Sequence, residues 1–292
     1  MGQNLLSGKH LSDEKAAYEY LSKLRWPEGP CCIHCGADKV ATLNVKSAKR
    51  VVLKCCKCRK QFSATVGTIF QGSHIPLSKW FMAIQLMCSS KKGMSAHQLH
   101  RMLLITYKSA WFMAHRIRHA MKQTPFGDKL GGIVEADETY IGGKSHGKGP
   151  IAGKTPVFAL VERGGRVRSF PMPIVTATNL KRSIQEHVEA NATLMTDELK
   201  AYTNIGKGFA DHQTVNHSKK EYVRGEASTN TVEGYFSLLK RGLTGTYHHV
   251  SPRHLHRYLD EFNFRYNARS ADDAVRNLMA LKATEGKRLQ YN

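Results

Sequence analysis

The sequence predicts an α/β protein with a mixed sheet in the second half of the chain, preceded by a cysteine-rich module and a group of helices. Two observations predict the first half: six of the seven cysteines lie between positions 31 and 58, and helical periodicity follows over residues 77–121. A third predicts the second half, where short apolar runs alternate with amphipathic stretches from residue 133 onward. A chain of 292 residues can bury more than one core.

The charge of the chain is strongly basic. It has 44 Lys and Arg against 23 Asp and Glu, a formal net charge of +21 and a pI of about 9.8. Between positions 39 and 127 it has sixteen Lys and Arg and no Asp or Glu. This excess predicts a polyanionic partner. No apolar run reaches the ~20 residues that span a bilayer, and the N-terminus lacks the apolar segment of a secretory signal, so we expect a cytoplasmic protein.

The N-terminal region predicts one short helix. Residues 11–24 carry apolar side chains at helical spacing, and Ser12 is placed to cap the first turn. The segment WPEGP ends this helix, because proline and glycine break helical structure, and leads into the cysteine-rich module.

Four cysteines predict a zinc site. The segments CIHC and CCKC hold two C-x2-C pairs separated by nineteen residues, a spacing at which four thiolates close a tetrahedral Zn²⁺ site. Four ligands leave no open coordination position, so this zinc ribbon is expected to be structural. Cys31 and Cys56 adjoin the pairs, so other pairings stay open, as do buried thiols without metal. The expected ligands are Cys32, Cys35, Cys55 and Cys58.

Basic residues around the second cysteine pair predict contact with phosphates. No acid lies within the next sixty residues to compensate them, and cations in such a module can hold the backbone of a nucleic acid. The alternative is a solvated cationic face. The residues are Lys54, Lys57, Arg59 and Lys60.

Three helices are predicted after the ribbon, over residues 77–89, 95–102 and 107–121. The last two are separated by a short turn in LLITY and resemble a helix-turn-helix, whose second helix enters the major groove of DNA by its amino-terminal end. A plain three-helix bundle is the alternative. The expected DNA-contacting residues are Tyr107, Lys108, Ser109, Arg116 and Arg118.

The order of apolar runs after residue 130 predicts the mixed sheet. IVEADETYI, TPVFALVER and RVRSFPMPIV are three strands, and ERGGR between the last two is a hairpin turn. They are followed by a helix in LKRSIQEHVEA, a strand in ATLMTD and a helix in ELKAYTNI. TVEGYFSLLKRGL and SPRHLHRYLDEFNFRYNA are the last two expected helices.

Carboxylates at three places in this region predict a second metal site. Alternation along the first strand puts Glu135 and Asp137 on one face and Glu138 on the other. Asp197 closes the later strand, and Glu233 lies near the start of a helix. Together such carboxylates can hold one or two Mg²⁺ ions, which prefer oxygen ligands and activate phosphodiester chemistry.

Each acid also has an alternative role. The two glutamates of the first strand could be solvated, and Asp197 could cap the helix that follows it. Asn230 and Glu233 fit a variant of the capping box. The histidines of TYHHVSPRHLHRYL suggest a metal site at first, but an apolar stripe places His254 and His256 on the flanks of a helix, where contact with phosphate is expected instead.

The chain resembles the ISXO-type group of bacterial insertion-sequence transposases over nearly its whole length. The motifs that carry the resemblance are CIHCG, CCKCRKQFSATVGTIF, TYKSAWFMAHRIRHAM, ADETYIGGK, TDELKAY and TNTVEGYFSLLKRGLTGTYHHVSPRHLHRYLDEFNFRYNAR. Members of the group join a zinc ribbon to a DDE catalytic domain of ribonuclease H-like fold. CCIHCG departs from the usual Cys-Pro of the first knuckle, which affects neither zinc ligand.

The resemblance implies a catalytic triad of Asp137, Asp197 and Glu233, holding Mg²⁺ or Mn²⁺. Asn230 is a neighbouring candidate for the third position. Lys240 matches the basic position that approaches the terminal DNA phosphates, and Arg241 lies beside it. The implied partners are the element's terminal repeats and target DNA, bound by a homodimer or larger assembly in the nucleoid. A zinc-ribbon regulator without catalysis and a nuclease without joining activity are the alternative functions.

The sequence therefore predicts five segments. These are an N-terminal helix in residues 1–27, the zinc ribbon in 28–72, the helical DNA-binding domain in 73–124, the ribonuclease H-like domain in 130–275 and a C-terminal tail in 276–292. A linker in TPFGDKLGG separates the helical domain from the α/β domain.

Overall fold

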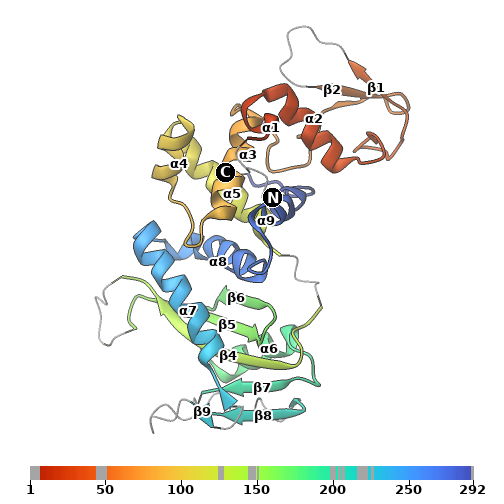
Figure 1. Ribbon diagram of the computed structural model, residues 1–292. Helices are drawn as coiled ribbons and strands as arrows, with labels where there is room; N and C mark the ends of the chain where they lie inside the picture. Colours follow the sequence, from red (N-terminus) through yellow and green to blue (C-terminus); the bar gives the residue numbers. More distant parts are fainter. Residues whose placement is uncertain are drawn as a thin grey trace. The chain divides into compact units, whose positions relative to one another are not determined.

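The computed structural model describes residues 7–43, 51–123, 128–143, 149, 151–197, 202, 205, 208–215, 223–224 and 227–290. The chain forms two compact units, one of residues 1–121 with 271–292 and one of residues 122–270 (Figure 1). Most of the helix predicted in ELKAYTNI, and residues 124–127 of the predicted linker, lie outside the described part. None of the described helices is long and apolar enough to cross a membrane.

The first unit holds the predicted ribbon and helices. Helices α1 (Lys9–Ser12) and α2 (Glu14–Arg25) precede an antiparallel sheet of β1 (Val40–Leu43), β2 (Val52–Cys55) and β3 (Gln61–Phe62). Helices α3 (Leu77–Ser89), α4 (Ala96–Leu103) and α5 (Tyr107–Met121) follow, as the periodicity predicted. The prediction of a Ser12 cap is wrong. The N-terminal helix is divided in two at Asp13, and the Asp13 carboxylate caps the second helix by accepting the N–H of Ala16 at 2.7 Å.

The C-terminal residues return to this first unit. Helix α9 (Asp273–Lys282), which takes in the start of the expected tail, packs against α3. Its Ala280 and Leu281 are buried, and Arg276 donates to the carbonyl of Cys88 at 3.2 Å. Cys88 itself is fully buried, as expected of a core thiol. Helix α9 is therefore part of the core that supports α3.

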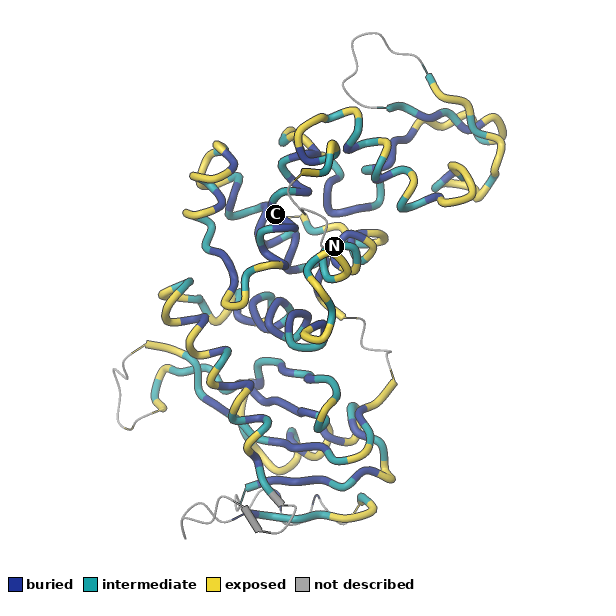
Figure 2. Tube along the Cα trace, in the orientation of Figure 1, coloured by how far each residue is buried: buried dark blue, intermediate teal, exposed yellow. Residues whose placement is uncertain are grey.

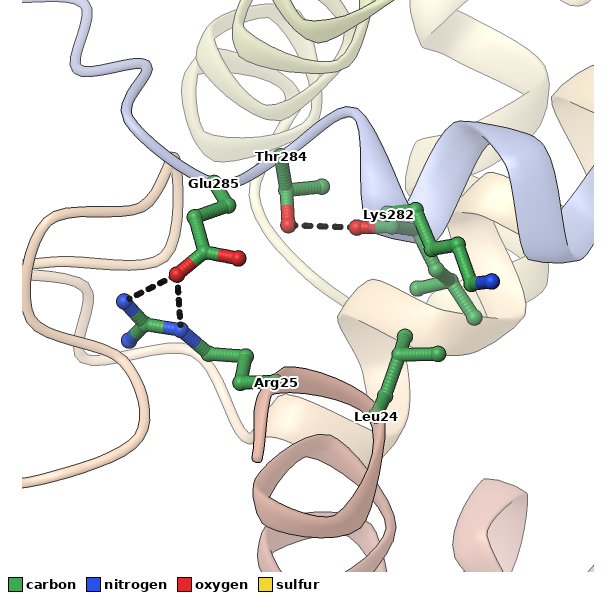
Figure 3. A pocket seen from close by; sticks show the side chains of 6 residues that line it. Leu24, Arg25, Lys282, Thr284 and Glu285 are labelled. Carbon is green, nitrogen blue, oxygen red and sulfur yellow. Dashed lines mark hydrogen bonds and ion pairs between the residues drawn. The ribbon is translucent and has the colours of Figure 1, made fainter. Parts of the chain in front are cut away.

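Arg25 joins the C-terminal segment to the loop that follows the ribbon. Its side chain is 6% exposed, and its Nη1 donates to the carbonyls of Ala64 and Val66 at 2.6 and 2.9 Å. Its Nε and Nη2 donate to Glu285 Oε1 at 3.2 and 3.0 Å, in the pocket drawn in Figure 3. The N–H of Gly286 donates to the carbonyl of Gly67 at 2.9 Å. One guanidinium thus connects three separate segments of the first unit.

The second unit is built on one mixed sheet of order β6-β5-β4-β7-β8. Strands β4 (Ile133–Ile141), β5 (Thr155–Glu162) and β6 (Val167–Pro171) form the predicted antiparallel meander. Strands β7 (Thr193–Thr196) and β8 (Asp211–Thr214) run parallel to β4. The predicted α/β class with a mixed sheet is confirmed, and β4 lies at its centre.

Helices cover both faces of this sheet. Helix α6 (Ala177–His187) packs Leu180 and Ile184 on the face that carries Val134 and Ala136 of β4. The opposite face packs against α7 (Asn230–Gly242), the π-helix η4 (Leu243–Tyr247) and α8 (Pro252–Asn267). The short strands β9 (Val223–Arg224) and β10 (Ala227–Ser228) precede α7. One apolar core therefore lies on each face of the sheet. The central strands between the two cores are largely buried (Figure 2).

Replacing Arg25 tests the attachment of the C-terminal segment. Arg25→Ala removes a buried cation with its hydrogen bonds to two carbonyls and one carboxylate, so we expect a loss of about 3 kcal/mol in the free energy of unfolding. Glu285→Ala is the matched control: that side chain is 53% exposed, and its loss should cost about 0.5 kcal/mol. Denaturant unfolding of both variants measures the difference. Equal losses would contradict the role of the carbonyl contacts.

Candidate metal centres and nucleic-acid surface

The four predicted zinc ligands converge on one point of the ribbon. The ligand atoms of Cys32, Cys35, Cys55 and Cys58 all lie within 4.8 Å of one another. Cys32 Sγ is 3.6 Å from Cys58 Sγ, and Cys35 Sγ is 3.6 Å from Cys55 Sγ. The open choice of pairing is settled, because neither Cys31 nor Cys56 belongs to this group.

Backbone amides prepare these sulfurs for a cation. The N–H of His34 donates to Cys32 Sγ and the N–H of Cys58 donates to Cys55 Sγ, each at 3.4 Å. The second of these bonds is the largest cause that lowers the pKa of the Cys55 thiol below its usual value, which favours the thiolate that binds metal. A soft tetrathiolate set at this spacing suits Zn²⁺, which would be held by all four sulfurs.

The basic residues beside the second cysteine pair remain at the surface. Lys57, Arg59 and Lys60 are exposed, and Lys54 on β2 is half-buried. Arg59 has a φ of 62°, a left-handed backbone conformation that closes the turn after Cys58. The ribbon thus presents these cations at its surface, beside the cysteines of the second pair, and their contact with phosphates stays a prediction.

The sheet register brings the first two predicted acids to neighbouring positions. Strand β4 pairs in parallel with β7, Val134 with Leu194 and Glu135 with Met195. Continuing this register by two residues pairs Asp137 with Asp197, which follows β7 directly. Neighbouring strands lie roughly 4.8 Å apart. Since Val134 belongs to the core on the α6 side, alternation places Asp137 on the α7 side. Asp197 follows the end of β7, and its charge raises the pKa of both Asp137 and Glu138.

Glu233 lies in the first turn of α7, over this same side of the sheet. Its carboxylate accepts the Thr229 hydroxyl at 2.9 Å, and its N–H donates to the Thr229 carbonyl at 3.0 Å. The capping-box interpretation is wrong, because Thr229 and not Asn230 is the residue before the helix. Asn230 is exposed in the first helical position.

The carboxylates repel one another electrostatically. Burial raises the pKa of Asp137 to about 8, and the negative charges of Glu138, Asp197 and Glu233 add to this effect. At neutral pH Asp137 therefore holds a proton unless a cation takes its place. Within the described residues, the carboxylate oxygens of the three acids do not form a cluster as tight as that of the four cysteine sulfurs. The set fits a hard divalent cation, which would complete its coordination with other oxygens.

Glu138 lies on the opposite face from Asp137, as alternation predicted. Its carboxylate accepts the hydroxyl of Tyr202 at 2.7 Å, and Tyr202 is buried in the core on the α6 side. Burial raises the pKa of Glu138 above its usual range. The N–H of Glu138 also donates to Asp137 Oδ1 at 2.7 Å, so its backbone supports the neighbouring acid. The solvated interpretation of Glu138 does not hold.

Glu135 is fully buried, which excludes the solvated interpretation of this residue. Its Oε1 accepts Arg163 Nε at 2.7 Å and Thr231 Oγ1 at 2.9 Å. Its Oε2 accepts the N–H groups of Thr231 at 2.8 Å and Val232 at 3.0 Å. No local pattern indicates this role, since the donors lie at least 28 residues away along the chain.

The predicted helix-turn-helix residues divide into exposed and buried sets. Tyr107 is 45% exposed and Lys108 is exposed at the start of α5, while Ser109 is half-buried and accepts the Thr106 hydroxyl at 2.9 Å. Two predicted DNA contacts are wrong. Arg118 is 1% exposed, and Arg116 donates to the carbonyls of Ile69 and Gln71, because this face of α5 packs inside the first unit.

The turn between α4 and α5 exposes apolar side chains that sequence reasoning missed. Leu104 is 83% exposed with a φ of 50°, and Met102 is 51% exposed. Tyr107 follows Leu104 by three residues, and its ring stacks on that of His97 with the centroids 4.3 Å apart. The helix end that forces Leu104 outward was visible in LLITY, but the pattern did not show which leucine would leave the core.

The remaining predicted contacts lie on α7 and α8. Lys240 and Arg241 are exposed near the end of α7, and Lys240 stands about 10 Å along the helix from Glu233. Among the described residues the histidines of α8 join no cluster of metal-ligating groups. Burial lowers the pKa of His254 and of His256, and Arg257 lowers both further.

Two family models and one relative match this chain. The model of the ISXO2-like transposase domain matches residues 129–267, and the model of a transposase zinc-ribbon domain matches residues 12–61. A relative from Halobacterium salinarum (strain ATCC 700922 / JCM 11081 / NRC-1) is described as an uncharacterized protein in transposable element ISH50. It is 28% identical over 276 residues, which cover 88% of this chain and 92% of the relative.

Adjacent cysteines of the ribbon allow a matched test of the zinc site. Cys55→Ser removes a buried sulfur from the cluster and should abolish stoichiometric zinc binding and unfold the ribbon, because the metal replaces the core of so small a module. Cys56→Ser changes the neighbouring exposed thiol and should retain zinc. Zinc content after dialysis measures both. Loss of zinc from the Cys56 variant would show that the ligand set is different.

Proposed function

Because the chain belongs to the ISXO2-like transposases, we propose that it cuts and joins DNA at the ends of an insertion sequence, using carboxylate-held Mg²⁺ or Mn²⁺. The observation that supports this proposal is the parallel register of β4 and β7: extended by two residues beyond its last pair, Glu135 with Met195, it would bring Asp137 beside Asp197, near the first turn of α7 that carries Glu233. Three acids from separate elements at one place suit a divalent cation.

The three carboxylates have a common task in this proposal. Asp137, Asp197 and Glu233 would hold the metal, which lowers the pKa of an attacking oxygen and stabilises the leaving one. In cleavage, the oxygen of water bonds to the phosphorus and the 3′ oxygen departs as a hydroxyl. In joining, this 3′-hydroxyl attacks a target phosphorus and displaces another 3′ oxygen. No covalent bond to the protein forms, so positioning and charge do the work.

The first unit and the end of α7 would bind the DNA. Exposed cations of the ribbon suit the phosphate backbone, and Tyr107 and Lys108 at the start of α5 suit the major groove. Lys240 and Arg241 on α7 suit the phosphates next to the reacting bond. Two element ends must be brought together, which supports a homodimer or larger assembly on DNA. The nucleoid in the cytoplasm is the corresponding place of action.

Asp137→Asn tests the catalytic role of the first acid. Removing a metal ligand should lower strand cleavage of a labelled element end by at least about a hundredfold. End binding should be unchanged, because the proposed binding residues lie elsewhere. Gel-shift and cleavage assays with Mg²⁺ on the same preparation measure the two activities. Normal cleavage by this variant would remove Asp137 from the site.

Neighbouring residues of α7 test the third acid. Glu233→Gln should abolish both cleavage and joining to a target plasmid, whereas Asn230→Ala, at an exposed position one turn earlier, should retain them. The reverse result would make Asn230 the third ligand. Wild-type protein that cuts but never links its product to target DNA would be a nuclease, and protein that binds without cutting would be a regulator.

The ribbon cations predict the salt dependence of DNA binding. Lys57→Ala and Lys60→Ala should each weaken binding similarly for specific and unrelated DNA, and each should reduce the slope of log K against log salt by about 0.9. Titrations at several salt concentrations measure the slope. Lys181→Ala, an exposed lysine on α6 of the second unit, is the control and should leave the slope unchanged. An unchanged slope in the ribbon variants would place them outside the phosphate contacts.

A further inference from the structure

Helix α7 begins without a capping side chain of its own. The first N–H groups of any helix lack partners within the helix. In α7 the residue before the helix, Thr229, makes no side-chain bond to these groups and donates its hydroxyl to Glu233 instead. Another residue must therefore satisfy the exposed end of the helix.

Glu135 supplies that cap from a distant part of the chain. Its carboxylate accepts the N–H groups of Thr231 and Val232, which lie 96 and 97 residues later. Arg163 holds the other oxygen through Nε, and its Nη2 donates to the carbonyl and hydroxyl of Ser228 at 3.1 and 2.6 Å. Ser228 ends β10, directly before α7. The pair therefore fixes both the helix start and the chain that enters it.

Both oxygens of Glu135 are fully used in these contacts. Each accepts two donors, and the residue is 0% exposed, so its lone pairs cannot serve a metal ion. Yet Glu135 lies two residues from Asp137 on the same face of β4, and its two amide donors lie one and two residues before Glu233. The contacts that link β4 to α7 therefore lie next to both Asp137 and Glu233, whose distance from each other depends on how α7 is held.

We propose that Glu135 and Arg163 are positioning residues that set the distance of Glu233 from Asp137 and thereby the affinity of the site for divalent metal. This inference rests on the proposed metal-dependent function. A carboxylate carries the negative charge that the helix N-terminus favours, and it accepts four bonds at once. A glutamine at this position has only one acceptor oxygen. Its amide nitrogen would face the donors of the other oxygen and could not accept from them, so those contacts would be lost.

Mn²⁺ binding tests the proposal without relying on catalysis. Zinc-loaded full-length wild type and Glu135→Gln are titrated with Mn²⁺, and free Mn²⁺ is followed by electron paramagnetic resonance. We expect affinity about tenfold weaker in the variant. The Mn²⁺ concentration for half-maximal cleavage should rise by the same factor, with cleavage recovered at high Mn²⁺. Faster hydrogen exchange at the Thr231 and Val232 amides should accompany this change.

Glu261→Gln is the matched control for general destabilisation. Glu261 is also fully buried in the second unit, where it pairs with Arg265 of α8 and accepts the hydroxyl of Tyr247 in η4 at 2.9 Å. Its variant should lose thermal stability while keeping the wild-type Mn²⁺ affinity. Equal weakening of Mn²⁺ binding in both variants, or unchanged binding in Glu135→Gln, would overturn the proposal.

A second variant keeps the proposal testable if Glu135→Gln does not fold. Arg163→Lys keeps the cation but cannot reach Glu135 and Ser228 together, and it should weaken Mn²⁺ binding by about threefold, less than full loss of the link. Unchanged Mn²⁺ affinity in a folded Arg163 variant would refute the positioning role. Wild type that neither binds Mn²⁺ nor cleaves DNA would refute the proposed function itself, which separates the two failures.

Discussion

A buried carboxylate is stable only where donors replace the water it has lost, and the second unit meets this condition at Glu135. Four donors from Arg163, Thr231 and Val232 surround it. Because β4 is the central strand, flanked by β5 and β7, this contact attaches α7 to the middle of the sheet. The positions of Glu233 and, two turns later, Lys240 follow from it, since a helix is rigid over such a length.

The acid-free run and the acids of the candidate site lie in different units. The acid-free run that starts at position 39 lies in the first unit up to residue 121, and the carboxylates of the candidate site lie in the second. The chain leaves the first unit at 121 and returns to it at 271, so the second unit is an insertion in the first. Helix α9 and Arg25 attach the returning segment to the rest of the first unit. The exposed cations of the ribbon and the acids of the candidate site are therefore each supported by a different core.

Local patterns predicted the elements, and distant contacts decided what single residues do. The helices at 77–89 and 107–121 and the four zinc ligands followed from spacing, because periodicity and ligand geometry are local properties. Burial of Arg118 did not, since the partners of α5 come from elsewhere in the chain. Asp137 and Asp197 could be proposed as acids at strand ends, but their pairing needed the parallel register of β4 and β7.

Two acids on one face of one strand can have opposite tasks because their donors differ. Glu135 has four donors, and its lone pairs are occupied whatever the ionic conditions. Within the part of the chain described, Asp137 accepts one amide and lies close enough to Glu138, Asp197 and Glu233 for their charges to raise its pKa. Burial and repulsion therefore both favour a neutralised Asp137, and either a proton or a bound cation can supply that neutralisation. The count of donors thus distinguishes the anchor from the candidate ligand, where strand alternation alone made them equivalent.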